Sequence, residues 1–165
     1  MKTVDEIIYD AICSDETLMA MIAYTTPQGG TAYAIKSTCF EVPPYELDNT
    51  PVPYIIVHNS GFTNQQTTKD CLWEAAEDQT VTTVEVAAHD PDGVNRIVRR
   101  MRKAIENHIA NIYRQQGINE IPQLQSLTSD GIDWDWSKPC YYQHLNYQCI
   151  TSANIDDDEE DNGTN

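Results

Sequence analysis

Residues 80–116 constrain the fold more than any other stretch, because their pattern predicts a strand, a short turn and one long helix. In residues 80–88, apolar and polar side chains alternate, as they do in a strand with one buried face. Asp90 is a suitable N-cap, and Pro91 occupies a position where the missing N–H costs nothing. The helix is expected to run to Gly117, a residue suited to the position after a helix end.

The predicted long helix is strongly amphipathic. At 100° per residue its apolar stripe comprises Val94, Ile97, Val98, Met101, Ile105, His108, Ile109 and Ile112. The other side carries Arg96, Arg99, Arg100, Lys103 and Arg114, with Arg102 at the border. We therefore expect the apolar stripe to pack on a sheet and the cations to face away from it.

In the N-terminal part of the chain, the spacing of apolar residues predicts a helix over residues 3–23. Thr3 and Glu6 match a capping box, and Ser14 or Asp15 is suited to restarting the helix. Residues 27–30 end it, and residues 31–42 predict either a strand or an extended arm.

Four further strands are predicted. Residues 54–57 form a short apolar run typical of a strand buried on both faces. A polar loop at 59–68 is expected to follow. Residues 69–77 would then form a hairpin with residues 80–88 through a two-residue turn at Asp78 and Gln79. Residues 124–128 and 141–151 supply the other strands, with residues 133–136 in or near a loop.

These elements predict an α+β fold. Its sheet is expected to be small and mostly antiparallel, packed by the N-terminal helix and the long amphipathic helix. Residues 1–154 are expected to form a single domain. Residues 155–165 are expected to be a disordered acidic tail, because they lack the apolar area that offsets the entropy of ordering.

The charge balance argues against nucleic-acid binding as a general role. The net charge is −16, and six of the acidic residues lie at positions 156–161. Such a surface repels phosphates. Five cysteines without a CxxC pair are typical of unpaired thiols in a reducing compartment. The sequence contains no apolar run long enough for a membrane span, and its first residues do not resemble a signal peptide.

The sequence contains no motif that predicts catalysis or metal binding. The sequence has no GxSxG, no Gly-rich phosphate loop and no HExxH. Cys140, His144 and Cys149 are close in sequence, but no fourth ligand accompanies them and zinc sites use tighter Cys pairs. We therefore predict no catalytic residue, no metal and no cofactor.

Other candidate groups have structural explanations. His108 lies on the apolar stripe, which favours a core histidine over a catalytic base. His89 and Asp90 resemble a proton relay, but Asp90 is better explained as a helix cap. Asp133 and Asp135 flank Trp134 like a paired-acid site or a sugar platform, whereas neighbouring Trp residues in a loop are more often a packing anchor or a protein contact.

The cationic side of the long helix has two readings. It is either a solvated helix surface or an interface in which it complements the acidic surface of another copy. The residues predicted to form a subunit or partner contact are Arg96, Arg99, Arg100, Arg102, Lys103, Trp134 and Trp136.

The order of elements over residues 1–151 resembles the tail-completion or tail-terminator proteins of long-tailed bacteriophages and prophages. The resemblance rests on the N-terminal helix with Asp5, Ile8 and Leu18, on Pro-Tyr-Ile at 53–55, and on Val-Glu-Val-Ala-Ala at 84–88 followed by the long helix. The segment 25–53 is longer than in that family and the acidic tail is additional. We expect the 25–53 segment to contact a neighbouring subunit or tube protein.

The resemblance implies a virion protein of the tail or neck, assembled in the bacterial cytoplasm. Members of this family form a ring, usually a hexamer, on the last ring of tail-tube protein, where it stops tube growth and meets head-completion or neck proteins. The ring would let DNA pass without specific binding. Family members have no catalytic site, and no membrane is involved.

Two alternatives stay open. The chain could be another neck or head–tail connector component. From a different class, it could be a small cytosolic enzyme or ligand-binding domain that uses Trp134, Asp133, Asp135 and His144.

Overall fold

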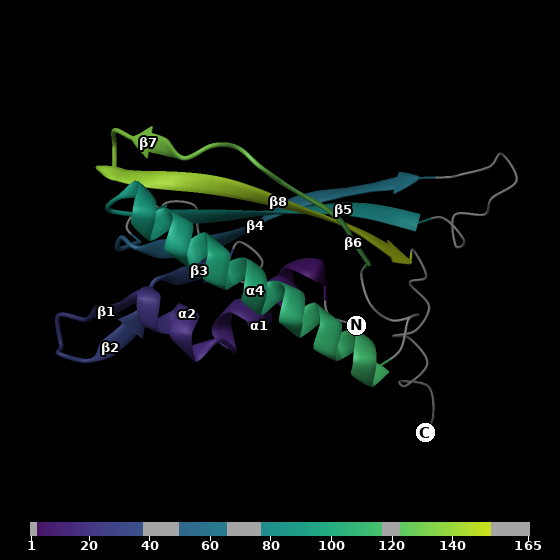
Figure 1. The fold of residues 1–165 in the computed structure, drawn as a ribbon, viewed down its shortest axis with the longest axis horizontal. Helices are drawn as coiled ribbons and strands as arrows, with labels where there is room; N and C mark the ends of the chain where they lie inside the picture. The colour runs from purple at the N-terminus through teal and green to yellow at the C-terminus, as the bar shows by residue number, and fades with distance from the viewer. Residues whose placement is uncertain (1–2, 38–49, 66–76, 117–122, 153–165) are drawn as a thin grey trace, which may run out of the picture.

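The computed structural model describes residues 3–37, 50–65, 77–116 and 123–152, and it has the predicted α+β fold (Figure 1). In chain order the elements are α1 (Val4–Cys13), α2 (Glu16–Met21), β1 (Ala23–Thr25), β2 (Thr31–Tyr33), β3 (Ile35–Ser37), β4 (Tyr54–Gln65), β5 (Glu77–Ala88), α4 (Pro91–Gln116), β6 (Gln123–Ser129), β7 (Asp133–Asp135) and β8 (Cys140–Ser152). The predicted acidic tail and residues 38–49 of the predicted arm lie outside the described residues.

One mixed sheet organises the molecule. Its strand order is β3-β4-β5-β8-β6, and β7 pairs with the beginning of β8. Every pairing in this sheet is antiparallel except that of β3 with β4. The predicted sheet, small and mostly antiparallel, is therefore confirmed. A separate hairpin of β1 and β2 was not predicted.

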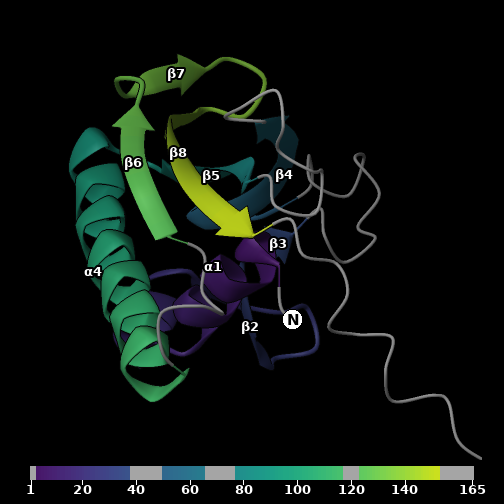
Figure 2. The same ribbon diagram turned by 90° about the vertical axis from the view of Figure 1, so that its right-hand side faces the viewer.

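The helices lie on one side of the sheet (Figures 1 and 2). Helix α4 packs against β5 and β8, and α1 packs against β4 and β5. We call this side of the sheet the helix-covered face and the other side the outer face. Buried residues on the helix-covered face include Ile55, Val57, Val84, Val86, Leu145, Tyr147 and Cys149.

Helix α4 begins and packs as its sequence predicts. The carboxylate of Asp90 accepts a hydrogen bond from the backbone N–H of Gly93 at 2.6 Å, which caps the helix. A Cβ atom at Gly93 would lie 3.0 Å from the Cβ of Ala88, so the glycine lets the helix turn back closely over β5. The apolar stripe is buried in its first four turns, at Val94, Ile97, Met101 and Ile105.

The N-terminal helical region is divided in two at the position predicted for a restart. Thr3 and Glu6 form the predicted capping box of α1. The Asp15 carboxylate then accepts the backbone N–H of Leu18 at 2.8 Å and caps α2. Since α2 ends at Met21, the predicted helix boundary at residue 23 was too late by two residues.

Two predicted loops are wrong because the sheet continues through them. Strand β4 extends to Gln65, where a polar loop was expected. Asp78 and Gln79 do not form a turn but lie inside β5, paired with Asn64 and Thr63. Polar residues are tolerated here because β5 has a strand on both sides that satisfies its backbone groups. The predicted strand at 69–77 falls mostly outside the described residues.

A buried polar contact joins α1 to the sheet. Asp5 and Thr82 are both buried, and the Thr82 hydroxyl donates a hydrogen bond to the Asp5 carboxylate. A buried polar group is costly unless it is hydrogen-bonded. This pair therefore fixes how α1 lies on β5.

Replacing Thr82 with Val removes the donor and leaves the Asp5 carboxylate without this partner. We expect the free energy of unfolding to fall by about 1–3 kcal/mol, measured by urea denaturation. Thr83→Val is the matched control, since Thr83 is half-buried on the outer face and donates to Asn146 at 2.7 Å. Its expected cost is about 0.5–1.5 kcal/mol. Equal losses for the two variants would contradict a special role for the buried pair.

Candidate functional site

The outer face carries a pocket at the end of the sheet where β7 meets β8. Its volume is about 510 Å³, and its walls come from β5, β8, β7 and the turn after β7. The lining residues are Glu85, Trp134, Asp135, Trp136, Ser137, Tyr142 and His144. Three of the residues named for the ligand-binding alternative, Trp134, Asp135 and His144, therefore lie together.

Glu85 is the central charged group of this pocket. It is paired across the strands with His144, whose Nε2 lies 2.7 Å from Glu85 Oε1. The Tyr54 hydroxyl donates to the other carboxylate oxygen at 2.8 Å. Burial and the negative charge of Glu85 raise the pKa of Tyr54 far above its usual value, so Tyr54 stays a neutral donor. The carboxylate is thereby held in one orientation.

Aromatic side chains form the opposite wall. The rings of Trp134 and Tyr141 meet edge to face with centroids 4.7 Å apart, and Trp136 lies 6.0 Å from Trp134. Trp136 is 89% exposed, an unusual state for so large an apolar side chain. The indole N–H of Trp134 is buried and has no hydrogen-bond partner among the described residues. Of these rings, Trp134 and Trp136 line the pocket together with Tyr142 and give it an apolar surface beside its charge.

Two aspartates add negative charge at the rim. The Asp135 carboxylate accepts hydrogen bonds from the hydroxyl and backbone N–H of Ser137 and from the N–H of Lys138. These bonds lower the pKa of Asp135 and hold it ionised. The charge of Asp133 raises the pKa of Tyr142, which places Asp133 close to that wall. Asp133 and Asp135 lie in the short strand β7, directly before a turn, which fits the predicted position in or near a loop.

The arrangement does not form a nucleophilic triad. The serine hydroxyl in the lining, that of Ser137, donates to Asp135 and not to His144. A triad needs the nucleophile bonded to the base. What the pocket offers is a fixed carboxylate, two further acids and aromatic faces, a combination suited to binding a cationic group.

The three residues considered for a metal site do not come together. Cys140 lies at the start of β8 with the outer-face residues Tyr142 and His144, while Cys149 is buried on the helix-covered face. Burial, with a contribution from Asp5, raises the pKa of Cys149 to about 11, which disfavours the thiolate that binds metals. Within the described ranges, no group of three His, Cys, Asp or Glu side chains is placed to hold a metal ion.

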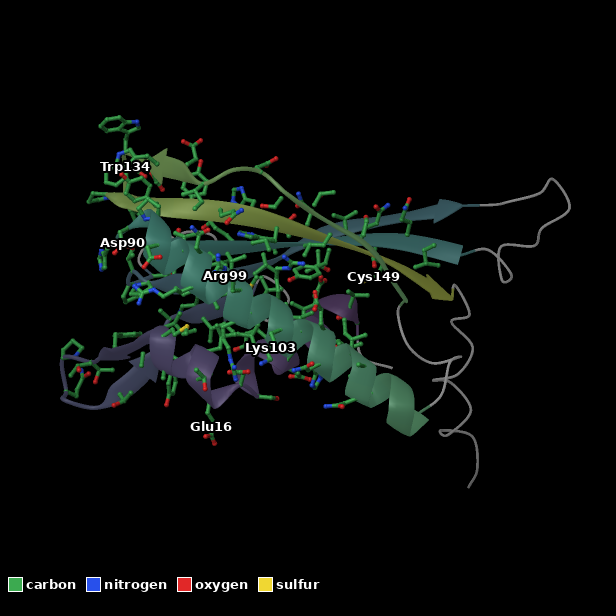
Figure 3. All side chains as sticks on the ribbon, in the orientation of Figure 1. Glu16, Asp90, Arg99, Lys103, Trp134 and Cys149 are labelled. Atoms are coloured by element: carbon green, nitrogen blue, oxygen red, sulfur yellow. The ribbon has the colours of Figure 1, made fainter. Side chains whose placement is uncertain are left out.

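The cations of α4 differ in their partners. Arg96 pairs with Asp92 at 3.3 Å, and Arg102 pairs with Glu106 at 3.7 Å, both on the helix surface. Arg99 and Lys103 are exposed and have no ion-pair partner in the part of the chain that the structure describes (Figure 3). They are four residues apart, so they share one side of the helix about 6 Å apart along its axis.

Arg100 is engaged inside the molecule. Its guanidinium contacts both carboxylate oxygens of Asp15, at 3.0 and 2.9 Å, and ties α4 to the cap of α2. Partial burial raises the pKa of Asp15, but the bonds from Arg100 and from the Leu18 N–H outweigh it and lower the pKa overall. This pairing accounts for Arg100 structurally and leaves Arg99 and Lys103 as the cations of the predicted contact set that have no ion-pair partner among the described residues.

The predicted contact residues thus lie at two places. The cations line α4, and Trp134 and Trp136 lie at the β7 end of the sheet (Figure 3). His108 is half-buried on α4, and His89 is exposed beside the Asp90 cap. Glu85 and Tyr142, which line the pocket, and Tyr54, which holds Glu85, were not predicted as site residues. Glu85 could have been noticed as the charged residue among the valines and alanines of 81–88.

Comparisons with known proteins add little. No protein-family model matches the sequence, and no curated protein matches it. A chain of a solved structure described as the virion of a native gene transfer agent (GTA) particle superposes with a TM-score of 0.47. It is 11% identical in sequence, and the match covers 89% of this chain and 92% of that one. Similarity at this level does not assign a function.

No helix in the described residues is long and apolar enough to cross a membrane.

We expect His58, which is half-buried on the outer face, to make the stability of the chain depend on pH. Burial and the charge of His144 lower the pKa of His58, and Glu85 opposes this shift. In the unfolded chain the pKa of His58 is near its ordinary value of about 6.5. His58 therefore binds a proton more readily in the unfolded chain than in the folded one. Stability contributed by neutral His58 is present above that value and is lost as pH falls below it.

We therefore expect His58→Gln to reduce the fall in melting temperature between pH 7.5 and pH 5. The control is His89→Gln, at an exposed histidine, which should leave that fall unchanged. Identical pH profiles for His58→Gln and the unaltered chain would contradict the assignment.

Proposed function

We propose that this chain is a structural protein of a phage-like particle. It assembles into a homo-oligomeric ring, in our proposal a hexamer, that caps the tail tube, ends tube growth and forms the joint to the head-completion proteins. In this role it belongs to the tail or neck of the virion and is assembled in the bacterial cytoplasm. DNA passes through the ring without specific binding.

The observation that carries the proposal is the exposure of Arg99 and Lys103. Both lie on α4, without an ion-pair partner among the described residues, in a chain whose net charge is −16. A cationic site on an otherwise acidic protein is complementary to the surface of another copy of the same protein. It is not suited to DNA, because the surrounding field is negative.

Two further features support an assembly role. The chain has the order of elements that underlies its resemblance to tail-terminator proteins, with α1, the strand at 54–57, the strand over 84–88 and α4. Trp136 exposes its indole at the surface, and aromatic residues are enriched in protein contacts.

The physical mechanism is surface complementarity. Contacts between unlike surfaces of identical subunits generate a ring when the rotation between neighbours closes. Such a ring, seated on the last ring of tube subunits, covers the surface on which the next tube subunits would dock. Its opposite side then presents a different surface to the head-completion proteins.

The decisive experiment mixes the purified chain with the tail-tube protein encoded in the same genome. Negative-stain images should show tubes of limited length with a ring at one end. Tubes of unlimited length, with no ring bound, would contradict the proposal. Replacing both Arg99 and Lys103 with Gln should weaken ring formation more at 0.01 M salt than at 1 M, since the screening length falls from about 30 Å to about 3 Å.

The matched control replaces Arg96 and Arg102 with Gln. It removes the same two positive charges from cations that already have partners on the helix. Ring formation by this control should be close to that of the unaltered chain. If the two double variants behave alike, net charge and not the unpaired pair governs assembly.

A small ligand-binding domain is the second candidate, because the pocket brings together Trp134, Asp135 and His144. Thermal unfolding with neutral sugars and nucleotides tests it. For an assembly protein we expect no rise in melting temperature with any of them. A concentration-dependent rise that is lost in Trp134→Ala would favour the ligand-binding domain.

A further inference from the structure

The pocket on the outer face has the chemistry of a site for a cationic side chain. Glu85, Asp133 and Asp135 supply negative charge at or beside it, and Trp134, Trp136 and Tyr142 supply aromatic surface. Guanidinium and ammonium groups bind to such a combination through charge and through the negative faces of aromatic rings. The chain shows this preference next to the pocket, where the ammonium of its own Lys138 lies 5.0 Å from the centroid of the Tyr54 ring.

The carboxylate inside the pocket is already orientated. Tyr54 and His144 each hold one oxygen of Glu85. A carboxylate accepts about four hydrogen bonds, so each oxygen keeps capacity for a further donor. A cationic group entering between Glu85 and Trp136 would therefore meet a fixed partner, which lowers the entropic cost of binding.

Arg99 and Lys103 of the same molecule cannot reach this pocket. Arg99 and Lys103 lie on α4, under the helix-covered face, while Glu85 and His144 lie on the outer face. In Figure 3, Trp134 lies on the opposite side of β8 from both cations. The sheet separates the two surfaces, so a contact between them joins two copies.

We propose that the pocket formed by Glu85, Trp134, Trp136 and Tyr142 receives Arg99 or Lys103 from α4 of a second copy of this chain. The contact is head-to-tail, because donor and acceptor are different surfaces. It rests on the proposed self-assembly and names the two surfaces that meet in it. Asp133 and Asp135 attract the incoming cation at the rim.

The test uses two defective variants of the full chain. Arg99→Gln with Lys103→Gln removes the donor and leaves the pocket intact. Trp136→Ala with Asp133→Asn removes one aromatic residue and one nearby charge of the acceptor and leaves α4 intact. Both positions on the acceptor are exposed, so the fold is expected to survive, which far-ultraviolet circular dichroism checks.

Sedimentation velocity at low salt measures the association. Each variant alone should associate about tenfold more weakly than the unaltered chain or worse, the loss of one well-placed cation–aromatic contact. An equimolar mixture of the two should form dimers, because one intact donor then meets one intact acceptor. These dimers should not grow further, because their remaining surfaces are both defective.

Controls separate this contact from general effects. Tyr33→Ala removes another exposed aromatic, 47% accessible and on the β1–β2 hairpin, and should associate like the unaltered chain. Arg96→Gln with Arg102→Gln serves the same purpose for α4. A mixture that stays monomeric, or an acceptor variant that associates normally, overturns the proposal. So does an unaltered chain that remains monomeric at all protein concentrations.

The outcome is distinguishable from failure of the tail-capping function. Capped tubes formed by the acceptor variant would leave tail capping standing and overturn this contact. If the mixture of the two variants forms dimers but the unaltered chain leaves tubes uncapped, the contact is supported and tail capping is contradicted. A third outcome is that the acceptor variant fails to cap tubes and the mixture of variants fails to form dimers. That result would assign the pocket to a tube or neck protein and would contradict a second copy as its occupant.

Discussion

The packing of α4 against β5 and β8 is the interaction on which the rest of the structure depends. The apolar stripe from Val94 to Ile105 buries one side of the helix and one face of the sheet together. Burying a side chain of this size contributes about 1.5–3 kcal/mol, so four of them outweigh a typical hydrogen bond of about 0.5–1.5 kcal/mol. Because successive side chains of a strand point to opposite faces, burying this face of the sheet in the core places Glu85, His144 and Tyr142 on the outer face. The position of the pocket is therefore a result of core packing.

Much of the fold could be predicted because it depends on patterns among residues that are close in sequence. The capping box at Thr3 and Glu6, the Asp90 cap and the stripe of α4 depend on residues a few positions apart, and each was predicted correctly. The errors occurred where tertiary pairing overrides local preference. Asp78 and Gln79 have the composition of a turn, but they lie in a strand because β4 and β8 flank them.

The candidate site was only partly predictable, for the same reason. Trp134, Asp135 and His144 were noticed as residue types, but Glu85 is 59 positions from His144 in the chain and joins it only through the register of β5 with β8. Likewise, sequence spacing placed Arg100 among the surface cations. Its pairing with Asp15, a residue 85 positions away, follows from how α2 packs beside α4. Periodicity shows which side of a helix a residue is on, but not which other element lies there.

The Arg100–Asp15 ion pair has a consequence for the geometry of assembly. It ties α4 to the cap of α2, in addition to the apolar packing of α4 on the sheet, and we expect this second attachment to restrict pivoting of the helix. In a head-to-tail contact between α4 and the β7 end, the angle between those two surfaces sets the rotation from one subunit to the next. The number of subunits in a closed ring would then be a property of internal rigidity. Loosening α2 from α4 would broaden the distribution of ring sizes while leaving both contact surfaces chemically intact.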